Sequence, residues 1–161
     1  MNKLVEYRNW VFEVDYQRTY EVYKQNEKGR PESCGCNNCR NFLVNRKQIY
    51  PVEFKNLLVE LGIDYKKESE IYHIYRAENG KHLYGGWFHF KGKIKEGKDC
   101  KIETPNGGNT IDTINLNKDF QIGFLKDNSL TFFDKEEREE LIQIEFYALS
   151  NWVIDKSLES E

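Results

Sequence analysis

Three of the four cysteines lie within six positions of the chain, as Cys34, Cys36 and Cys39. Thiolates at this spacing can ligate a soft metal ion such as Zn²⁺, and the two residues between Cys36 and Cys39 match the spacer of a zinc knuckle. Gly35 allows the backbone to turn so that Cys34 points toward the other two thiols. The segment therefore predicts a zinc site that lacks one ligand.

The sequence has no second cysteine pair that would complete this site. The single residues that could supply the fourth ligand are Cys100, His73, His82 and His89. If the chain forms a hairpin about Asn79-Gly80, His73 and His82 lie at similar distances from the turn and can approach each other or the thiols. The predicted ligand set is the three cysteines with His82, although each histidine could instead be a hydrogen-bonded structural residue.

Two other interpretations of the cysteines stay open. Cys36 and Cys39 form a C-x-x-C pair that can carry redox chemistry, but the strand–helix–strand flanks of a thioredoxin-like site are missing. The thiols can also be reduced small residues at the start of a helix. A helix capped by Asn37 or Asn38 and running to about Arg46 would place Cys39 in its first turn, where the positive helix end favours a thiolate.

A second helix must follow the cysteine segment. Its apolar residues recur at the i, i+3, i+4 and i+7 positions, as Phe54, Leu57, Leu58 and Leu61. Pro51 suits the first helical position, and Gly62 is expected to end the helix in a left-handed conformation. The pattern is typical of a helix that packs one face against a core.

The chain before the cysteines is expected to be strand and loop. Apolar and acidic residues alternate over residues 10–16, which predicts a half-buried strand. The aromatic residues at 20–23 extend this strand or begin its hairpin partner. The polar segment 25–33 contains Gly29 and Pro31 and predicts a loop.

Further strand patterns fill the chain after Gly62. We expect these strands over residues 71–76, 83–94, 111–116, 119–125, 130–134 and 141–153. Gly85 and Gly86 interrupt the longest strand, and we interpret them as a bend rather than as a close approach by another group. The charged residues 134–140 predict a solvated loop or one helical turn.

These elements predict an α+β fold. We expect a mostly antiparallel curved sheet, as a sandwich or partial barrel of about seven strands, with two helices packed on one side. Residues 1–161 should form a single domain, with residues 155–161 as a frayed tail.

The amino-acid composition restricts the classes of protein to which this chain can belong. Hydrophobic residues make up 39% of the 161 residues and aromatic residues 14%, as in a folded protein. No apolar run is long enough to cross a membrane, and the first ten residues lack an apolar signal core. We therefore expect a cytoplasmic protein with reduced cysteines.

The leading functional hypothesis is a non-enzymatic module that binds another protein. No linear catalytic motif is present, although an enzyme with a site assembled from scattered loops stays an alternative. The net charge of −3 divides into +4 over residues 1–100 and −7 over residues 101–161. Such polarity and a surface rich in Tyr and Trp suit protein recognition. The chain is similar in size and composition to small bacterial inhibitors and immunity-type proteins, but no motif identifies a family.

One strand face is the predicted partner-binding surface. It carries the residues Trp87, His89, Lys91 and Lys93. Three further lysines follow at Lys95, Lys98 and Lys101, so single-stranded nucleic acid is the alternative partner, held by phosphate contacts and base stacking. The sequence pI of 5.7 argues against that alternative.

Overall fold

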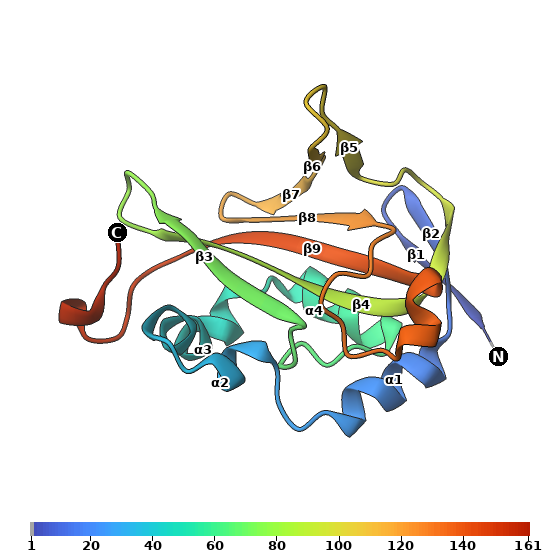
Figure 1. Ribbon diagram of the computed structural model, residues 1–161, viewed down its shortest axis with the longest axis horizontal. Coiled ribbons are helices and arrows are strands. Elements are labelled where there is room, and N and C mark those ends of the chain that lie inside the picture. The colour runs from blue at the N-terminus through green and yellow to red at the C-terminus, as the bar shows by residue number, and fades with distance from the viewer. Residues whose placement is uncertain (1) are drawn as a thin grey trace.

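The computed structural model describes residues 2–161 and is shown in Figure 1. Its helices are α1 (Tyr16–Gln25), α2 (Arg30–Cys34), α3 (Asn37–Ile49) and α4 (Val52–Leu61), with the short 3₁₀ helices η1 (Lys135–Glu140) and η2 (Lys156–Leu158). Its strands are β1 (Lys3–Tyr7), β2 (Trp10–Val14), β3 (Glu70–Arg76), β4 (His82–Glu96), β5 (Lys101–Glu103), β6 (Asn109–Ile111), β7 (Ile114–Asn117), β8 (Phe120–Leu125) and β9 (Leu141–Ser150).

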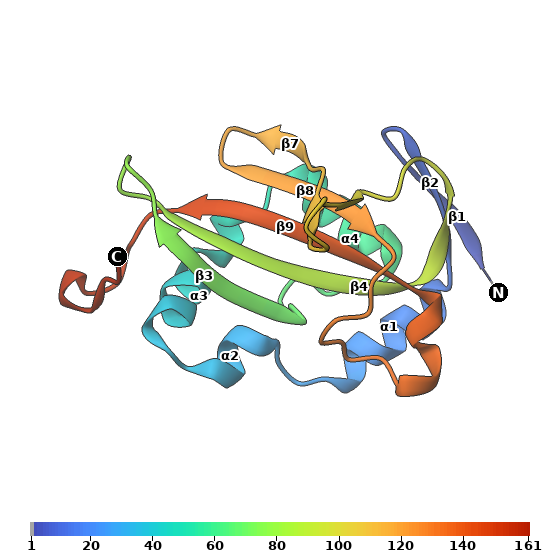
Figure 2. The same ribbon diagram turned by 45° about the horizontal axis from the view of Figure 1, so that its top comes forward.

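Seven strands form one antiparallel sheet in the order β1-β2-β4-β9-β8-β7, and β3 pairs with the first half of β4. The sheet is open and does not close into a barrel. Figures 1 and 2 show the helices gathered on one side of this sheet, while the separate β5–β6 hairpin stands on the other side. The predicted α+β class, antiparallel pairing and one-sided helices are therefore confirmed, but the structure has four α-helices where the sequence pattern indicated two.

Residues 16–25 form helix α1, whereas residues 20–23 were expected to extend the preceding strand or to begin its hairpin partner. Asp15 begins the helix, because its carboxylate accepts a hydrogen bond of 3.1 Å from the backbone N–H of Arg18. The buried residues Thr19, Val22 and Tyr23 then recur at i, i+3 and i+4. The sequence pattern did not distinguish this helix from a strand, because aromatic and β-branched residues also favour strands.

The polar segment that was expected to be a loop contains the short helix α2. Pro31 lies in its first turn, where a missing N–H removes no helical hydrogen bond. Gly35 ends α2 with φ of 71°, and Cys36 begins α3 directly afterwards. Gly62 ends α4 in the left-handed conformation, with φ of 88°, as predicted.

The long strand β4 is the central element of the sheet. Its first half pairs with β3 and its last residues pair with β2, which leaves His89 and Lys91 between the two partners on the same edge. Helix α1 closes this gap. The Tyr23 hydroxyl accepts a hydrogen bond from the His89 N–H and donates one to its carbonyl, while Thr19 accepts one from the Lys91 N–H. Side chains of α1 thus replace a missing strand.

Gly85 and Gly86 do not interrupt β4, which runs unbroken from His82 to Glu96. A Cβ atom at Gly85 would lie 2.5 Å from the Tyr72 ring, and one at Gly86 would lie 2.5 Å from the Glu70 carbonyl oxygen. The two glycines therefore permit a close approach by β3, which is the interpretation that the sequence analysis did not favour.

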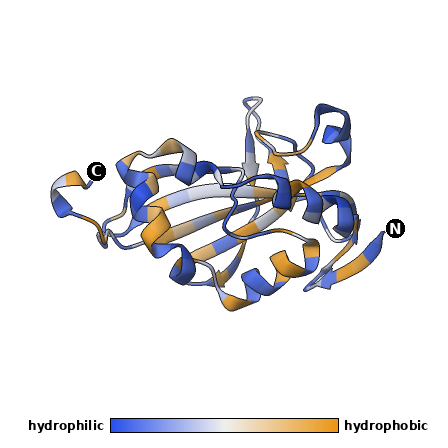
Figure 3. Ribbon diagram, turned by 90° about the horizontal axis from the view of Figure 1, so that it is seen from below, coloured by the Kyte–Doolittle hydropathy of each residue, from blue (hydrophilic) through white to orange (hydrophobic). Residues whose placement is uncertain are grey.

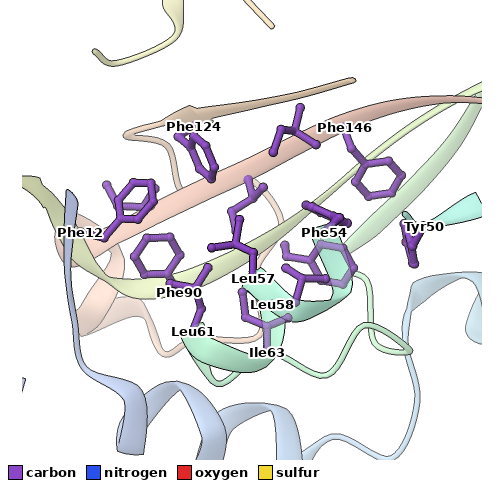
Figure 4. Close-up of a cluster of buried hydrophobic side chains, with 14 of the residues drawn as sticks. Phe12, Tyr50, Phe54, Leu57, Leu58, Leu61, Ile63, Phe90, Phe124 and Phe146 are labelled. Carbon is purple, nitrogen blue, oxygen red and sulfur yellow. The ribbon is translucent and has the colours of Figure 1, made fainter. Parts of the chain in front are cut away.

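The hydrophobic core lies between the sheet and the helices. Figure 4 shows Phe54, Leu57, Leu58 and Leu61 of α4 meeting aromatic side chains that extend from the strands. Tyr50 contacts Phe54 and Phe146 with ring centroids 5.6 and 5.4 Å apart. Figure 3, seen from the helical side, shows hydrophilic and hydrophobic segments alternating along the helices, as expected for helices that bury one face.

Residues 130–134, expected to be a strand, form bends and irregular backbone, and the Trp87 ring N–H donates a hydrogen bond to the Leu130 carbonyl. The tail, expected to be frayed, contacts the body of the protein. Glu159 accepts a hydrogen bond from His82 at 2.8 Å, and Ser160 donates one to Asn38 at 2.7 Å.

Within residues 2–161, every helix falls short of the length and apolarity that a bilayer span requires.

Candidate functional site

The junction of α2 and α3 brings the three predicted thiols together. We name Cys34, Cys36 and Cys39 the cysteine corner. Their Sγ atoms all lie within 4.8 Å of one another. Tetrahedral ligation of Zn²⁺, with Zn–S distances of about 2.3 Å, requires sulfur atoms about 3.8 Å apart. Only small side-chain movements separate the observed arrangement from that geometry, so the corner can hold a metal ion.

Local backbone structure sets this arrangement. Cys34 is the last residue of α2, Gly35 makes the left-handed turn, and Cys36 is the N-cap of α3. The Cys36 sulfur accepts a hydrogen bond of 3.4 Å from the Cys39 N–H. Sulfur here takes the place of the oxygen of a usual capping residue, which corrects the expectation that Asn37 or Asn38 caps this helix.

The three thiols differ in their environments. Cys34 and Cys36 are exposed, whereas Cys39 is buried. A hydrogen bond from the Cys36 backbone N–H, together with the neighbouring thiols, lowers the pKa of Cys34. Burial raises the pKa of Cys39. In the absence of a metal, Cys34 is therefore the more easily ionised of these two thiols, and a bound cation would deprotonate both.

His82 does not join the cysteine corner. Its Nδ1 atom lies 2.8 Å from Nε2 of His73, and its Nε2 atom lies 2.8 Å from a carboxylate oxygen of Glu159. The predicted approach of His73 to His82 is therefore found, but both ring nitrogens of His82 have partners other than a metal. Among residues 2–161, no other His, Cys, Asp or Glu completes the group of three thiols.

A buried ion-pair network supports the corner. The Arg46 guanidinium of α3 bonds Glu32 of α2 at 2.8 Å and Glu68, which precedes β3, also at 2.8 Å. Glu68 is fully buried and additionally accepts a hydrogen bond from the Tyr50 hydroxyl. The network fixes α2 and α3 against the body of the protein, and thereby fixes the spacing of the thiols.

The predicted partner-binding face is only partly available. His89 is fully buried, so it cannot contact a partner. Lys91 forms ion pairs with Glu137 and Glu140. Trp87 is half-buried beside a cavity, and the side chain of Lys93 is 62% exposed. The four residues do not form one exposed surface, because His89 is buried and Lys91 is held by the carboxylates of η1.

The lysines proposed to hold nucleic acid are largely neutralised. Lys93 pairs with Glu13, Lys98 with Asp112 and Lys101 with Asp127. Phosphate binding requires lysines whose charge is free to release counterions. The paired carboxylates weaken the nucleic-acid alternative at this surface.

The cavity beside Trp87 was not predicted from the sequence. It lies on the sheet face opposite the helices, and Glu145 and Gln143 of β9 line it together with Trp87. The only sequence signal was the regular alternation along β9, which predicted Gln143 and Glu145 on one face and implied that this face was solvated.

Comparison with known proteins does not supply a function. No family model, no curated protein and no solved structure matches this chain. Protein binding, predicted from the sequence, accordingly stays a prediction.

Proposed function

We propose that this protein binds Zn²⁺ at the cysteine corner, with Cys34, Cys36 and Cys39 as thiolate ligands. The single observation that carries the proposal is the convergence of three sulfur atoms within 4.8 Å of one another. Soft thiolate ligands favour zinc over hard cations such as Mg²⁺ and Ca²⁺. The backbone N–H groups at the start of α3 add electrostatic support for negative sulfur.

The proposed site has three protein ligands and one open position. Structural zinc sites are usually closed by four protein ligands, whereas sites with three keep a position for water or another ligand. Since Cys34 and Cys36 are exposed, that position would face solvent. The proposal is therefore an accessible and exchangeable zinc ion that braces α2 against α3, rather than one on which the whole fold depends.

Metal analysis tests the proposal directly. Protein purified without chelator should contain about one zinc per chain by elemental mass spectrometry. Its three corner thiols should react with a thiol reagent only after chelator is added. Replacement of zinc by Co²⁺ should give the charge-transfer absorption of thiolate ligation.

The variant Cys36→Ser should reduce zinc affinity by more than the roughly 10–100-fold typical for loss of an outer-shell partner. The matched control is Cys100→Ala, because Cys100 is also a free cysteine but lies outside the corner. Equal zinc content in Cys36→Ser and in the unchanged protein would overturn the proposal. A Cys36–Cys39 disulfide in freshly purified protein would instead favour redox chemistry.

A further inference from the structure

The sheet face opposite the helices contains buried polar residues. Gln143 and Glu145 alternate with Ile144 and Phe146 along β9, and all four are buried. One face of an antiparallel sheet commonly faces water when its residues are polar. Here the β5–β6 hairpin and residues 126–134 cover that face. A polar face enclosed in this way requires partners for its buried groups.

These side chains form a hydrogen-bonded chain with a fixed direction. The amide nitrogen of Gln143 donates to Oε1 of Glu145 at 2.8 Å, and the Tyr147 hydroxyl donates to Oε2 at 2.7 Å. Because the Gln143 nitrogen is the donor, its oxygen accepts from Nε2–H of His89 at 2.9 Å. All of these donors lead toward the Glu145 carboxylate, so negative charge is concentrated there.

Glu145 differs from the other buried carboxylates in having no cation beside it. Glu68 pairs with Arg46, and Glu137 pairs with Arg18. No Lys, Arg or His lies within ion-pair distance of Glu145 in the part of the chain that the structure describes. Burial raises the pKa of Glu145, as expected for a carboxylate without a compensating charge.

The other end of this hydrogen-bonded series, at His89, is also incompletely partnered among the described residues. His89 is fully buried, and within residues 2–161 its Nδ1 atom has no hydrogen-bond partner. Burial lowers the pKa of His89 to about 4, so the ring is neutral at pH 7. A purely structural network would be expected to satisfy such groups, whereas unsatisfied buried groups occur at functional sites.

Glu145 opens into a cavity of about 230 Å³. Trp87 and Tyr147 supply aromatic rings to its wall, and the β5–β6 hairpin supplies Asn109 and Thr110. The Trp87 ring is held in place, because its N–H donates to the Leu130 carbonyl at 3.0 Å. A fixed aromatic ring beside a carboxylate attracts a cation through both its quadrupole and the neighbouring charge.

We propose that this cavity binds an organic cation, a guanidinium or ammonium group, which pairs with Glu145 beside Trp87 and Tyr147. The group can come from a small free amine or from an Arg or Lys side chain of a partner protein. Lys101 lines the same cavity and lies 3.8 Å from Asp127 across the site. The Lys101 ammonium group therefore competes with a bound cation for the negative charge of the cavity. The inference is independent of zinc at the cysteine corner.

Titration with methylguanidinium, followed by NMR, tests the inference. The ring N–H signal of Trp87 should shift with methylguanidinium but not with N-methylurea, which is similar in shape and uncharged. The variant Glu145→Gln should weaken binding at least tenfold, since it removes the charge and keeps the side-chain size. The matched control Glu60→Gln changes an exposed glutamate on α4 and should leave binding unchanged.

A second variant keeps the test decisive if Glu145→Gln folds poorly. Lys101→Met should strengthen methylguanidinium binding several-fold, because it removes the competing ammonium group. Peptides with one arginine, compared with matched citrulline peptides, distinguish the sources of the cation. Tighter binding of the arginine peptide than of methylguanidinium indicates a protein partner, and equal binding indicates a small amine. Equal shifts with methylguanidinium and N-methylurea, or no shift even in Lys101→Met, would overturn the inference.

Discussion

The cysteine corner and the Glu145 cavity concentrate reactive groups in opposite ways. The corner takes its three thiols from six consecutive positions at the meeting of two helices, and two of the thiols are exposed. The cavity takes its groups from β4, β9, the β5–β6 hairpin and the segment after β8, and its central residues Gln143 and Glu145 are buried. One site is built by local backbone geometry and the other by sheet register.

This difference also appears in the electrostatics. At the corner, backbone N–H groups lower the pKa of Cys34, so the protein favours the charged form of that ligand. In the cavity, burial raises the pKa of Glu145, so the protein disfavours the charged form. The corner thus stabilises the anion of Cys34, while the cavity leaves the Glu145 anion in need of an external cation.

The largest effect is expected from removing the Arg46 ion pairs, which support the cysteine corner but do not touch the Glu145 cavity. Arg46→Met removes the cation from the fully buried Glu68, and an uncompensated buried charge costs about 3–5 kcal/mol. Urea denaturation should show that decrease in the free energy of unfolding. The control Arg40→Met lies on the exposed side of the same helix and should stay within about 0.5 kcal/mol. Equal effects of both variants would show that the buried Arg46–Glu68 ion pair does not stabilise the protein.

Zinc should stabilise the protein by mass action at the corner. At a free zinc concentration 100 times the dissociation constant, the free energy of unfolding should rise by about 2.7 kcal/mol. Thermal melts with and without chelator measure this difference. Cys100→Ala should retain the gain and Cys36→Ser should lose it. A gain that persists in Cys36→Ser would place the zinc elsewhere.

A smaller effect tests the ion pairs that hold η1 against α1 and β4. Hydrogen bonds from Arg18, with Lys91 nearby, lower the pKa of Glu137 to about 2. Glu137→Gln should therefore reduce the free energy of unfolding at pH 7 by about 1–2 kcal/mol. The loss should be complete above the ordinary pKa of 4.5 and should disappear as the pH falls toward 2, because protonation of Glu137 in the unchanged protein removes the charge that glutamine lacks.

The control for Glu137 is its neighbour Asp134, which bonds the same arginine but has a side chain that is 71% exposed. Asp134→Asn should change stability by less than about 1 kcal/mol. A difference between Glu137→Gln and the unchanged protein that stays constant from pH 2 to pH 7 would show that the ion pair is not its cause.

The smallest expected effect is an increase in the free energy of unfolding, and it tests the electrostatic difference between the cavity and the cysteine corner. Glu145→Gln should raise the free energy of unfolding at pH 7 by up to about 1 kcal/mol, as expected when a poorly compensated functional charge is removed. The gain should be absent below the ordinary pKa of 4.5, should grow as the pH rises from there toward the raised pKa of Glu145, and should stay constant above it. Urea titrations at several pH values measure it. Destabilisation at pH 7 would mean that Glu145 is a structural residue.

Local patterns in the sequence determined several elements correctly. The spacing of Phe54, Leu57, Leu58 and Leu61 predicted α4, and Gly62 predicted its end. The cysteine spacing predicted a group of three thiols that could hold a metal. Each of these features depends on residues within about two helical turns of one another, so backbone geometry alone relates their spacing to their positions in space.

Tertiary structure decided the remaining features. The residues of α1 also fit a strand pattern. In the structure they form a helix, whose Tyr23 and Thr19 hydroxyls accept hydrogen bonds from the backbone N–H groups of His89 and Lys91 at the edge of β4. Whether Glu145 faces solvent or a cavity depended on the hairpin and segment that cover it. His82 met Glu159, 77 positions away, and not the thiols. Burial and long-range pairing are sums over distant parts of the chain, and no local window of sequence contains them.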